Sequence, residues 1–122
     1  MDFPKAKILK VVQPKKQKEG VGAIVYRALG TYEMKTFDPF LMLDFFHTKL
    51  PSGFPDHPHR GFQTLTYIIE GEMLHEDFKG NKGSIKPGGI QWMIAGKGIV
   101  HAEIPGCKDT ETIGFQLWIN LP

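Results

Sequence analysis

Short apolar segments, each closed by glycine or proline, constrain the fold of this chain more than any other feature of its sequence. The 122 residues include 14 glycines and 9 prolines, and apolar and polar residues alternate within most segments. Alternation with a period of two is typical of strands with one buried face, whereas helices bury residues with a period near 3.6. Frequent glycine and proline interrupt long helices and suit tight turns. The sequence therefore predicts short strands joined by turns.

The pattern is strong enough in eight segments for each to be expected as a strand. They span residues 5–13, 22–30, 37–46, 62–71, 72–78, 90–96, 99–105 and 112–122. The lysine-rich residues 14–22 are expected to form a polar turn, and residues 49–58 a long irregular loop. Nothing shows the strand–helix alternation of a parallel sheet. We therefore expect an all-β jelly roll or barrel, formed as a single domain by residues 1–122.

The balance of charge argues against a nucleic-acid-binding protein. The chain carries 15 Lys and Arg against 13 Asp and Glu, a formal net charge of +2, whereas binding by phosphate neutralisation usually needs a larger basic excess. No segment approaches the roughly 20 apolar residues of a membrane-spanning helix, and the first residues lack the apolar run of a secretory signal. Cys107 is the single cysteine, so no intrachain disulfide forms. We expect a cytoplasmic protein, or a nuclear one in a eukaryote.

Two pairs of potential metal ligands occur at the same spacing. His57 and His59 flank Pro58, which favours an extended backbone at His57, and His101 and Glu103 are also separated by one residue. Residues i and i+2 of a strand project from the same face, so each pair can point into the interior of a β fold. Three imidazoles and one carboxylate would then bind a divalent transition metal and leave coordination positions open for water or substrate.

Each motif alone has a simpler explanation, because a lone His-x-His or His-x-Glu is more often surface polarity than a metal site. Here both motifs have the spacing of a strand in a chain predicted to be all-β, and three of the five histidines fall within them, which makes metal binding the better interpretation. His75, beside two acidic residues and a turn, is expected at a strand end on the surface. Gln116 is expected either to reach the interior pocket or to face outward.

Longer blocks of the sequence carry a more specific signal. The segments FPDHPHRGFQT, QWMIAGKGIVHAE and GFQLWINLP resemble the N-terminal half of the pirins, a family of the cupin superfamily. The resemblance extends from about residue 19 to the last residue. It implies a cupin-type jelly roll (a double-stranded β-helix barrel) that holds one Fe²⁺ ion through His57, His59, His101 and Glu103. The same ligands accept Mn, Co, Ni, Cu or Zn.

Two departures from the usual pattern bear on the site and on assembly. Many cupins place a glutamate shortly after His-x-His, where this chain has Gln63; the pirin-like set uses Glu103 instead. Gln63 is expected either to hydrogen-bond a ligand in the substrate pocket or to face a neighbouring strand. Pirins are usually bicupins with a second barrel. A single barrel would leave an apolar surface exposed, so we expect it to pair with a second copy as a homodimer.

The candidate site admits three functional hypotheses. In the first, the protein resembles a quercetin 2,3-dioxygenase: the metal site binds a flavonol and O₂, and Glu103 is the catalytic base that accepts the flavonol's proton. In the second, the iron is not catalytic, and its oxidation state tunes a protein-binding surface, as in pirins that resemble transcription co-regulators. In the third, the metal only tethers two segments of the barrel.

Overall fold

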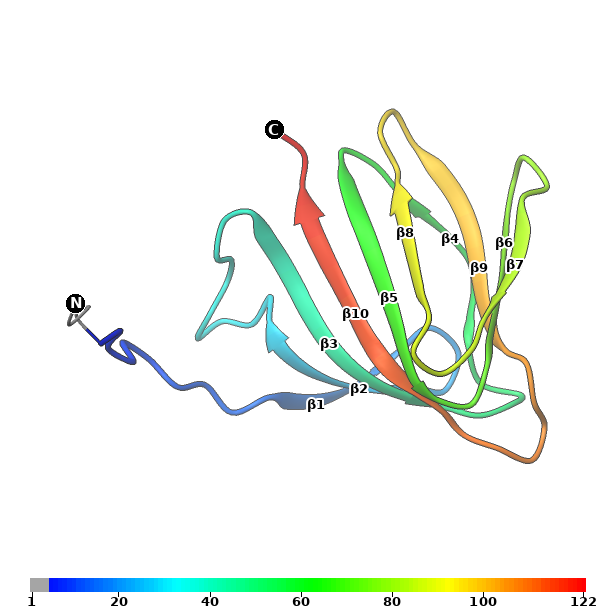
Figure 1. The fold of residues 1–122 in the computed structure, drawn as a ribbon, viewed down its shortest axis with the longest axis horizontal. Helices are drawn as coiled ribbons and strands as arrows, with labels where there is room; N and C mark the ends of the chain where they lie inside the picture. The colour runs from blue at the N-terminus through cyan, green and yellow to red at the C-terminus, as the bar shows by residue number, and fades with distance from the viewer. Residues whose placement is uncertain (1–4) are drawn as a thin grey trace.

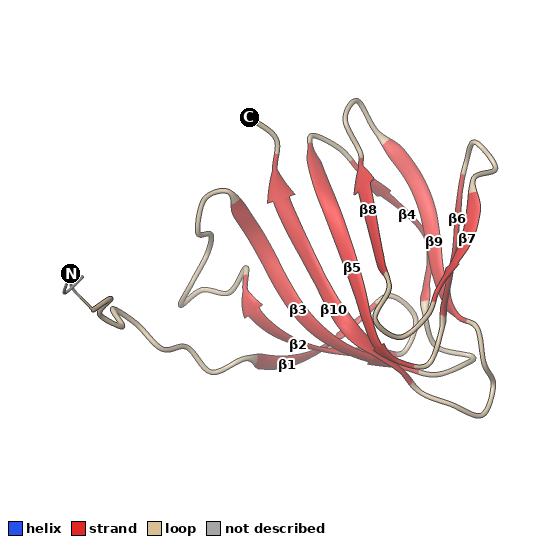
Figure 2. Ribbon diagram, viewed as in Figure 1, coloured by secondary structure: helices blue, strands red, loops and turns tan. Residues whose placement is uncertain are grey.

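Ten strands in two sheets make up the computed structural model, which describes residues 5–122 (Figure 2). The strands are β1 (Lys15–Glu19), β2 (Ala23–Leu29), β3 (Phe40–Thr48), β4 (Phe54–His59), β5 (Phe62–Glu70), β6 (Met73–Asp77), β7 (Lys82–Ile85), β8 (Ile90–Ile94), β9 (Ile99–Pro105) and β10 (Thr112–Asn120). Residues 5–122 contain no helix, and hence none that is long and apolar enough to cross a membrane. The first four residues of the expected domain lie outside this description.

The two sheets face each other as the halves of a jelly roll. Antiparallel pairing gives the larger sheet the order β1-β2-β3-β10-β5-β8 and the smaller sheet the order β4-β9-β6-β7. Figure 1 shows the larger sheet curving across the molecule, with β4, β9, β6 and β7 at the right of the view. The predicted all-β jelly roll is confirmed.

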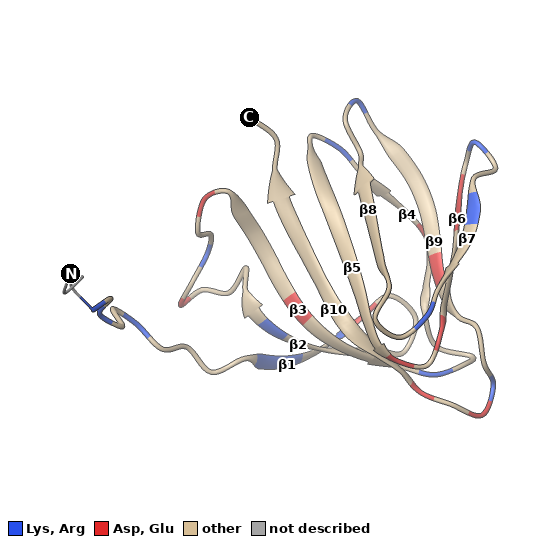
Figure 3. Ribbon diagram, viewed as in Figure 1, with Lys and Arg blue, Asp and Glu red and all other residues tan. Residues whose placement is uncertain are grey.

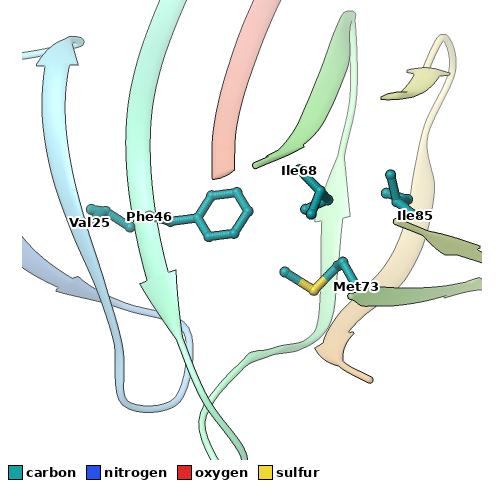
Figure 4. Packing of buried hydrophobic residues seen from close by; sticks show 5 residues of the cluster. All are labelled: Val25, Phe46, Ile68, Met73 and Ile85. Atoms are coloured by element: carbon teal, nitrogen blue, oxygen red, sulfur yellow. The ribbon is translucent and has the colours of Figure 1, made fainter. Parts of the chain in front are cut away.

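Alternate residues of both sheets point into the space between them and form the core. The main cluster draws one side chain from each of five strands (Figure 4): Val25, Phe46, Ile68, Met73 and Ile85. None of these side chains is more than 4% exposed, and burying each one stabilises the fold by about 1.5–3 kcal/mol. The period of two in the sequence therefore arises from burial on one face of each strand.

A close approach between strands explains a glycine within β10. A Cβ atom at Gly114 would lie 2.3 Å from the carbonyl oxygen of Tyr67 and 2.8 Å from Cζ of Phe46, well inside normal contact distances. The absence of a side chain lets the Phe46 ring lie over β10, which runs between β3 and β5.

Replacing Phe46 by alanine is expected to destabilise the fold by about 3–5 kcal/mol, the usual cost of deleting a buried aromatic side chain. The ring is 1% exposed and packs edge-on against Phe54 with centroids 6.0 Å apart, so its loss leaves a cavity between the sheets. Urea unfolding followed by circular dichroism measures the change. Phe78→Ala, at a side chain that is 62% exposed, is the control. Equal stability of the two variants would contradict this assignment of the core.

Two predictions about the N-terminal region were wrong. Residues 5–13 form no strand, and β1 lies instead within residues 14–22, the segment predicted as a turn. β1 pairs with β2 through its backbone at the edge of the sheet, where charged side chains are tolerated and hinder pairing with further strands. Figure 3 shows Lys and Arg concentrated in this part of the chain. Apolar alternation could not locate a strand whose side chains are polar.

The segment predicted as an irregular loop, residues 49–58, also contains the beginning of a strand. β4 starts at Phe54 and pairs with β9, with a shift of register between Phe54 and His57. Such a bulge places an extra residue in one strand and re-aims the side chains around it. It therefore helps to set the direction of the histidines in β4.

Candidate metal centre

Strands β4 and β9 bring the three predicted histidines together. The two strands are antiparallel neighbours, and their register places His57 directly opposite His101. Paired residues project from the same face, and His59 follows His57 on that face. One ligand nitrogen from each of the three rings lies within 4.8 Å of the others. Three imidazoles therefore converge at one point on the inner face of the smaller sheet.

The spacing of the ring nitrogens suits coordination to one ion. Nε2 of His59 lies 3.0 Å from Nε2 of His101, and two ligands at right angles with bonds of about 2.1 Å would also be about 3.0 Å apart. Nδ1 of His57 is 2.8 Å from the carbonyl oxygen of Pro55. Because a carbonyl only accepts, this nitrogen donates its hydrogen there, and in the neutral ring the lone pair is then on Nε2 of His57. The donor set thus fits a divalent transition metal.

Burial keeps two of these rings neutral. It lowers the pKa of His59 to about 4 and the pKa of His101 to about 3, and repulsion from neighbouring imidazoles acts in the same direction. A neutral imidazole offers the lone pair that a metal requires. Near neutral pH, therefore, neither ring has to lose a proton before it binds an ion.

Glu103 extends from β9 and is held in place by side chains of the larger sheet. Thr66 Oγ1 donates to its Oε1 at 2.7 Å, and Gln116 Nε2 approaches its Oε2 at 3.5 Å. Burial raises the pKa of Glu103, while the Thr66 hydrogen bond opposes that rise. Oε2 lies 3.9 Å from Nε2 of His101. Glu103 is outside the group of donors that are mutually within 4.8 Å, so its role as a ligand stays a prediction.

The cluster borders a cavity of about 700 Å³ between the sheets. Its wall includes His57, His59 and Glu103 from the smaller sheet and Gln116 and Trp118 from β10. A volume of this size lies within the range of small-molecule sites in proteins, roughly 300–1,000 Å³. A ligand in the cavity would therefore lie against the imidazole cluster.

The two glutamines considered for the pocket lie on opposite faces of the larger sheet. Gln116 lines the cavity. Gln63 is not among the residues that line this cavity, and it accepts a hydrogen bond from Nε1 of the exposed Trp92 at 2.8 Å. Strand parity explains the difference, because the buried residues of β5 are the even-numbered Thr64, Thr66 and Ile68. Of the two expectations for Gln63, contact with a neighbouring strand is the one observed.

Two other side chains near the site were misjudged or missed. His75 does not lie at a strand end: it occupies the centre of β6, pairs with Glu103 and packs its ring over Gly83. Burial lowers the pKa of His75. Thr66 was not singled out, although its place two residues before Ile68 in an alternating segment indicated an inward side chain. In β6 the alternation of inward and outward residues was harder to recognise, because acidic residues follow His75.

Metal-free Glu103→Gln protein is expected to lose stability as the pH falls below about 6.5. The folded-state pKa values of His59 and His101 lie near 4 and 3, so between these values and 6.5 the unfolded chain binds more protons and is favoured. At pH 5 the cost is roughly 2 kcal/mol for each ring. The substitution removes the carboxyl of Glu103, whose raised pKa acts in the opposite sense. Melting temperatures at pH 7.5 and 5.0 test this; equal values would contradict it.

Comparison with known families identifies the group of proteins to which this site belongs. The sequence profile of the family described as Pirin matches residues 22–119, a range that includes all three clustered histidines and Glu103. The chain belongs to the pirin family. Human Pirin is 53% identical over 116 residues, which cover 94% of this chain and 40% of Pirin. The chain spans 34% to 45% of the length of the pirin-like proteins that it matches in sequence.

Solved structures share the fold. A quercetin 2,3-dioxygenase from Acinetobacter baumannii is 35% identical and aligns with a TM-score of 0.78 over 91% of this chain and 39% of its own. The bacterial pirin YhhW from Escherichia coli, solved in complex with nickel(II), is 26% identical and aligns with a TM-score of 0.80 over 88% of this chain and 48% of its own. These likenesses confirm that the jelly roll is of the cupin type found in pirins.

Proposed function

We propose that this pirin-family chain binds one iron ion through His57, His59, His101 and Glu103 and acts as an oxygenase of the quercetin 2,3-dioxygenase type. The observation that carries the proposal is the convergence of three imidazoles, two of which, His57 and His59, line a cavity of about 700 Å³. The similarity to a quercetin 2,3-dioxygenase supports the reaction type, and the nickel bound by YhhW supports metal binding. The proposed substrates are flavonols such as quercetin.

The side chains of the cavity suit a planar aromatic ligand. Phe62 and Trp118 have ring centroids 4.6 Å apart, and both lie within 5.3 Å of the His59 ring. Aromatic faces pack well against the flat rings of a flavonol. When bound, iron would supply a Lewis-acid centre for the flavonol's oxygens and a redox partner for O₂. The protein's part is to orient the flavonol beside the imidazoles and to exclude water.

Glu103 is the group best placed to accept the proton of the flavonol hydroxyl. Burial raises its pKa, and a carboxylate with a raised pKa is a stronger base. Thr66 holds Oε1 through a hydrogen bond at 2.7 Å, which leaves Oε2 on the side of His101. A proton taken up at Oε2 would stay in a buried position, away from solvent.

Anaerobic loading with Fe²⁺, followed by addition of quercetin and O₂, tests the proposal. We expect loss of the quercetin absorbance with release of one carbon monoxide per turnover, and neither in metal-free protein. A protein that binds iron stoichiometrically but turns over no quercetin would contradict the enzymatic proposal. That outcome would favour the alternative, an iron-dependent protein-interaction module.

We also propose that the chain forms a homodimer through β8. This strand ends the larger sheet among the described residues, and its outward side chains Ile90, Trp92 and Ile94 are 57%, 59% and 65% exposed. The β8 strand of a second copy offers the same unpaired edge and the same apolar side chains. The two edges can pair about a twofold axis, which brings the apolar side chains of the two copies together. Light scattering should give twice the mass of one chain, and Trp92→Arg should halve it. Leu74→Arg, on the outer face of β6, is the control; a monomeric mass for the unmodified protein would contradict the proposal.

A further inference from the structure

A row of polar side chains crosses the inner face of the larger sheet. Register pairs Arg27 of β2 with Asp44 of β3, Asp44 with Gln116 of β10, and Gln116 with Thr66 of β5. On one side of this row the inner positions are apolar: Val25, Phe46 and Ile68 belong to the core cluster. Buried polar groups cost free energy unless they are hydrogen-bonded. Four in one row therefore call for an explanation beyond packing.

One end of the row is an ion-paired cluster. Arg27 donates from Nε and Nη2 to the two carboxylate oxygens of Asp44 at 2.8 and 2.7 Å, and from Nη2 to Glu19 at 3.0 Å. Asp44 is only 4% exposed. A carboxylate buried to this degree is stable only when paired, and replacing such a pair by well-packed apolar residues is often neutral or stabilising. The cluster is better explained by ligand recognition than by stability.

The other end of the row leads to Glu103 and has a fixed direction. Thr66 donates its hydroxyl hydrogen to Glu103, so it accepts from Gln116 Nε2, which lies 2.8 Å away. This fixes the orientation of the Gln116 amide. Its Oε1 is consequently left buried with no hydrogen-bond partner among residues 5–122. Gln116 and Asp44 are register partners, so an unfilled acceptor lies next to the ion-paired cluster.

The row forms part of the wall of the cavity that borders the histidines. Glu19, Arg27, Asp44 and Gln116 all line it, together with apolar Met42. Strands are spaced by about 4.8 Å, so Asp44 lies about 10 Å from Thr66, two strands away, and hence well apart from the carboxylate that Thr66 holds. One molecule can therefore contact the metal ligands with one part and the ion-paired cluster with another.

The charges of Glu19, Arg27 and Asp44 determine which chemical group of a ligand can bind at the ion-paired cluster. Two carboxylates against one guanidinium disfavour a carboxylate or phosphate. Each oxygen of Asp44 accepts one hydrogen bond from Arg27 and has a further lone pair for a donor. Nη1 of Arg27 has no hydrogen-bond partner within the described chain, so it can donate to an acceptor. A phenolic hydroxyl both donates to a carboxylate and accepts from a guanidinium.

We propose that Glu19, Arg27, Asp44 and Gln116 form a subsite for the phenolic hydroxyls on the part of an aromatic substrate that lies away from the metal ligands. The inference rests on the proposed function and narrows its substrate class to flavonols that carry hydroxyls on the pendant ring. Flavonols without them lose these hydrogen bonds and leave the carboxylates of the subsite without a donor from the ligand.

The test compares two flavonols that differ only in these hydroxyls. Quercetin carries two on its pendant ring and galangin none. Their affinities for Zn²⁺-loaded protein, measured anaerobically by quenching of tryptophan fluorescence, separate binding from turnover because zinc has no redox chemistry. We expect quercetin to bind about tenfold more tightly than galangin, the value of one hydrogen bond to a charged group.

Variants that replace a carboxylate by an amide show which residues cause the difference in affinity between quercetin and galangin. Glu19→Gln and Asp44→Asn should each reduce the preference for quercetin by about threefold to tenfold while leaving galangin affinity nearly unchanged. Glu19 is partly exposed, so its variant keeps the test valid if the Asp44 variant fails to fold. Glu76→Gln, at an exposed carboxylate on β6, is the matched control. Equal affinities for the two flavonols, or a preference that both variants leave unchanged, would overturn the subsite alone; failure of both flavonols to bind would overturn it together with the proposed function.

Discussion

Replacing His101 by alanine is expected to lower the affinity for a divalent transition metal by about a hundredfold or more, since even residues that only support a ligand are worth roughly tenfold to a hundredfold. Its Nε2 lies 3.0 Å from Nε2 of His59 and 3.9 Å from Oε2 of Glu103, and its ring centroid lies 4.5 Å from that of His57. Without it only two of the three clustered imidazoles remain to bind the ion. Competition with a chromogenic chelator, for zinc and for Fe²⁺ under anaerobic conditions, gives the change in affinity.

The matched control for this experiment is His47→Ala. His47 also lies in a β-strand, but its side chain packs against Tyr26 and Phe45 and approaches Glu111, away from the cavity wall. This variant should bind metal like the unmodified protein. Circular dichroism of both variants separates loss of a ligand from loss of the fold, because His101 is 2% exposed and its removal leaves a small cavity. Metal affinity unchanged in His101→Ala would rule out the histidine cluster as the site.

Much of this candidate site could be predicted because its potential ligands lie in pairs that are close together in the sequence. His57 and His59 are two positions apart, as are His101 and Glu103, and the period of two in a strand is independent of what lies beside it. That two such pairs lie side by side did not follow from period alone. It followed from the resemblance to pirins, and in the structure it arises from the pairing of β4 with β9.

The rest of the site depends on register between strands far apart in sequence. Thr66 meets Glu103, and Arg27 meets Asp44, only because particular strands are neighbours with a particular offset. A shift of one residue in β5 would turn Thr66 outward and Gln63 inward. Short segments of sequence do not specify such offsets, which is why Gln63 and Gln116 could not be told apart beforehand.

The error over β1 has a different physical cause. An edge strand is held by backbone hydrogen bonds on one side, so its side chains need not be apolar. Lys15, Lys16 and Lys18 satisfy that condition, while the apolar residues that precede them find no partner strand. Even so, this strand supplies Glu19 to the cavity wall. A segment that sequence reasoning treated as a solvated turn thus contributes to the interior.

Replacing Glu103 by glutamine is expected to lower kcat for quercetin by about 10²–10⁴-fold, the usual contribution of a positioned general base. Glutamine keeps the shape of the side chain and can still accept the Thr66 hydrogen bond at Oε1, but its amide group takes up no proton at the position of Oε2, beside His101. Because the amide is also a poorer ligand, kcat must be measured at saturating Fe²⁺. The low-pH limb of the kcat profile should disappear with the base.

Thr66→Val separates positioning by Thr66 from basicity at Glu103. It removes the hydroxyl that holds Oε1 at 2.7 Å but leaves the carboxylate in place, so the pH profile should keep its acidic limb, shifted upward, while kcat falls less than in Glu103→Gln. Thr66→Ser should restore most of the activity because it returns the donor. Loss of this hydrogen bond removes a contribution that lowers the pKa of Glu103, which gives the direction of the shift. A Glu103→Gln variant that retains the unmodified kcat and pH profile at saturating iron would show that the proton goes elsewhere and that Glu103 serves the fold or the ligand set alone.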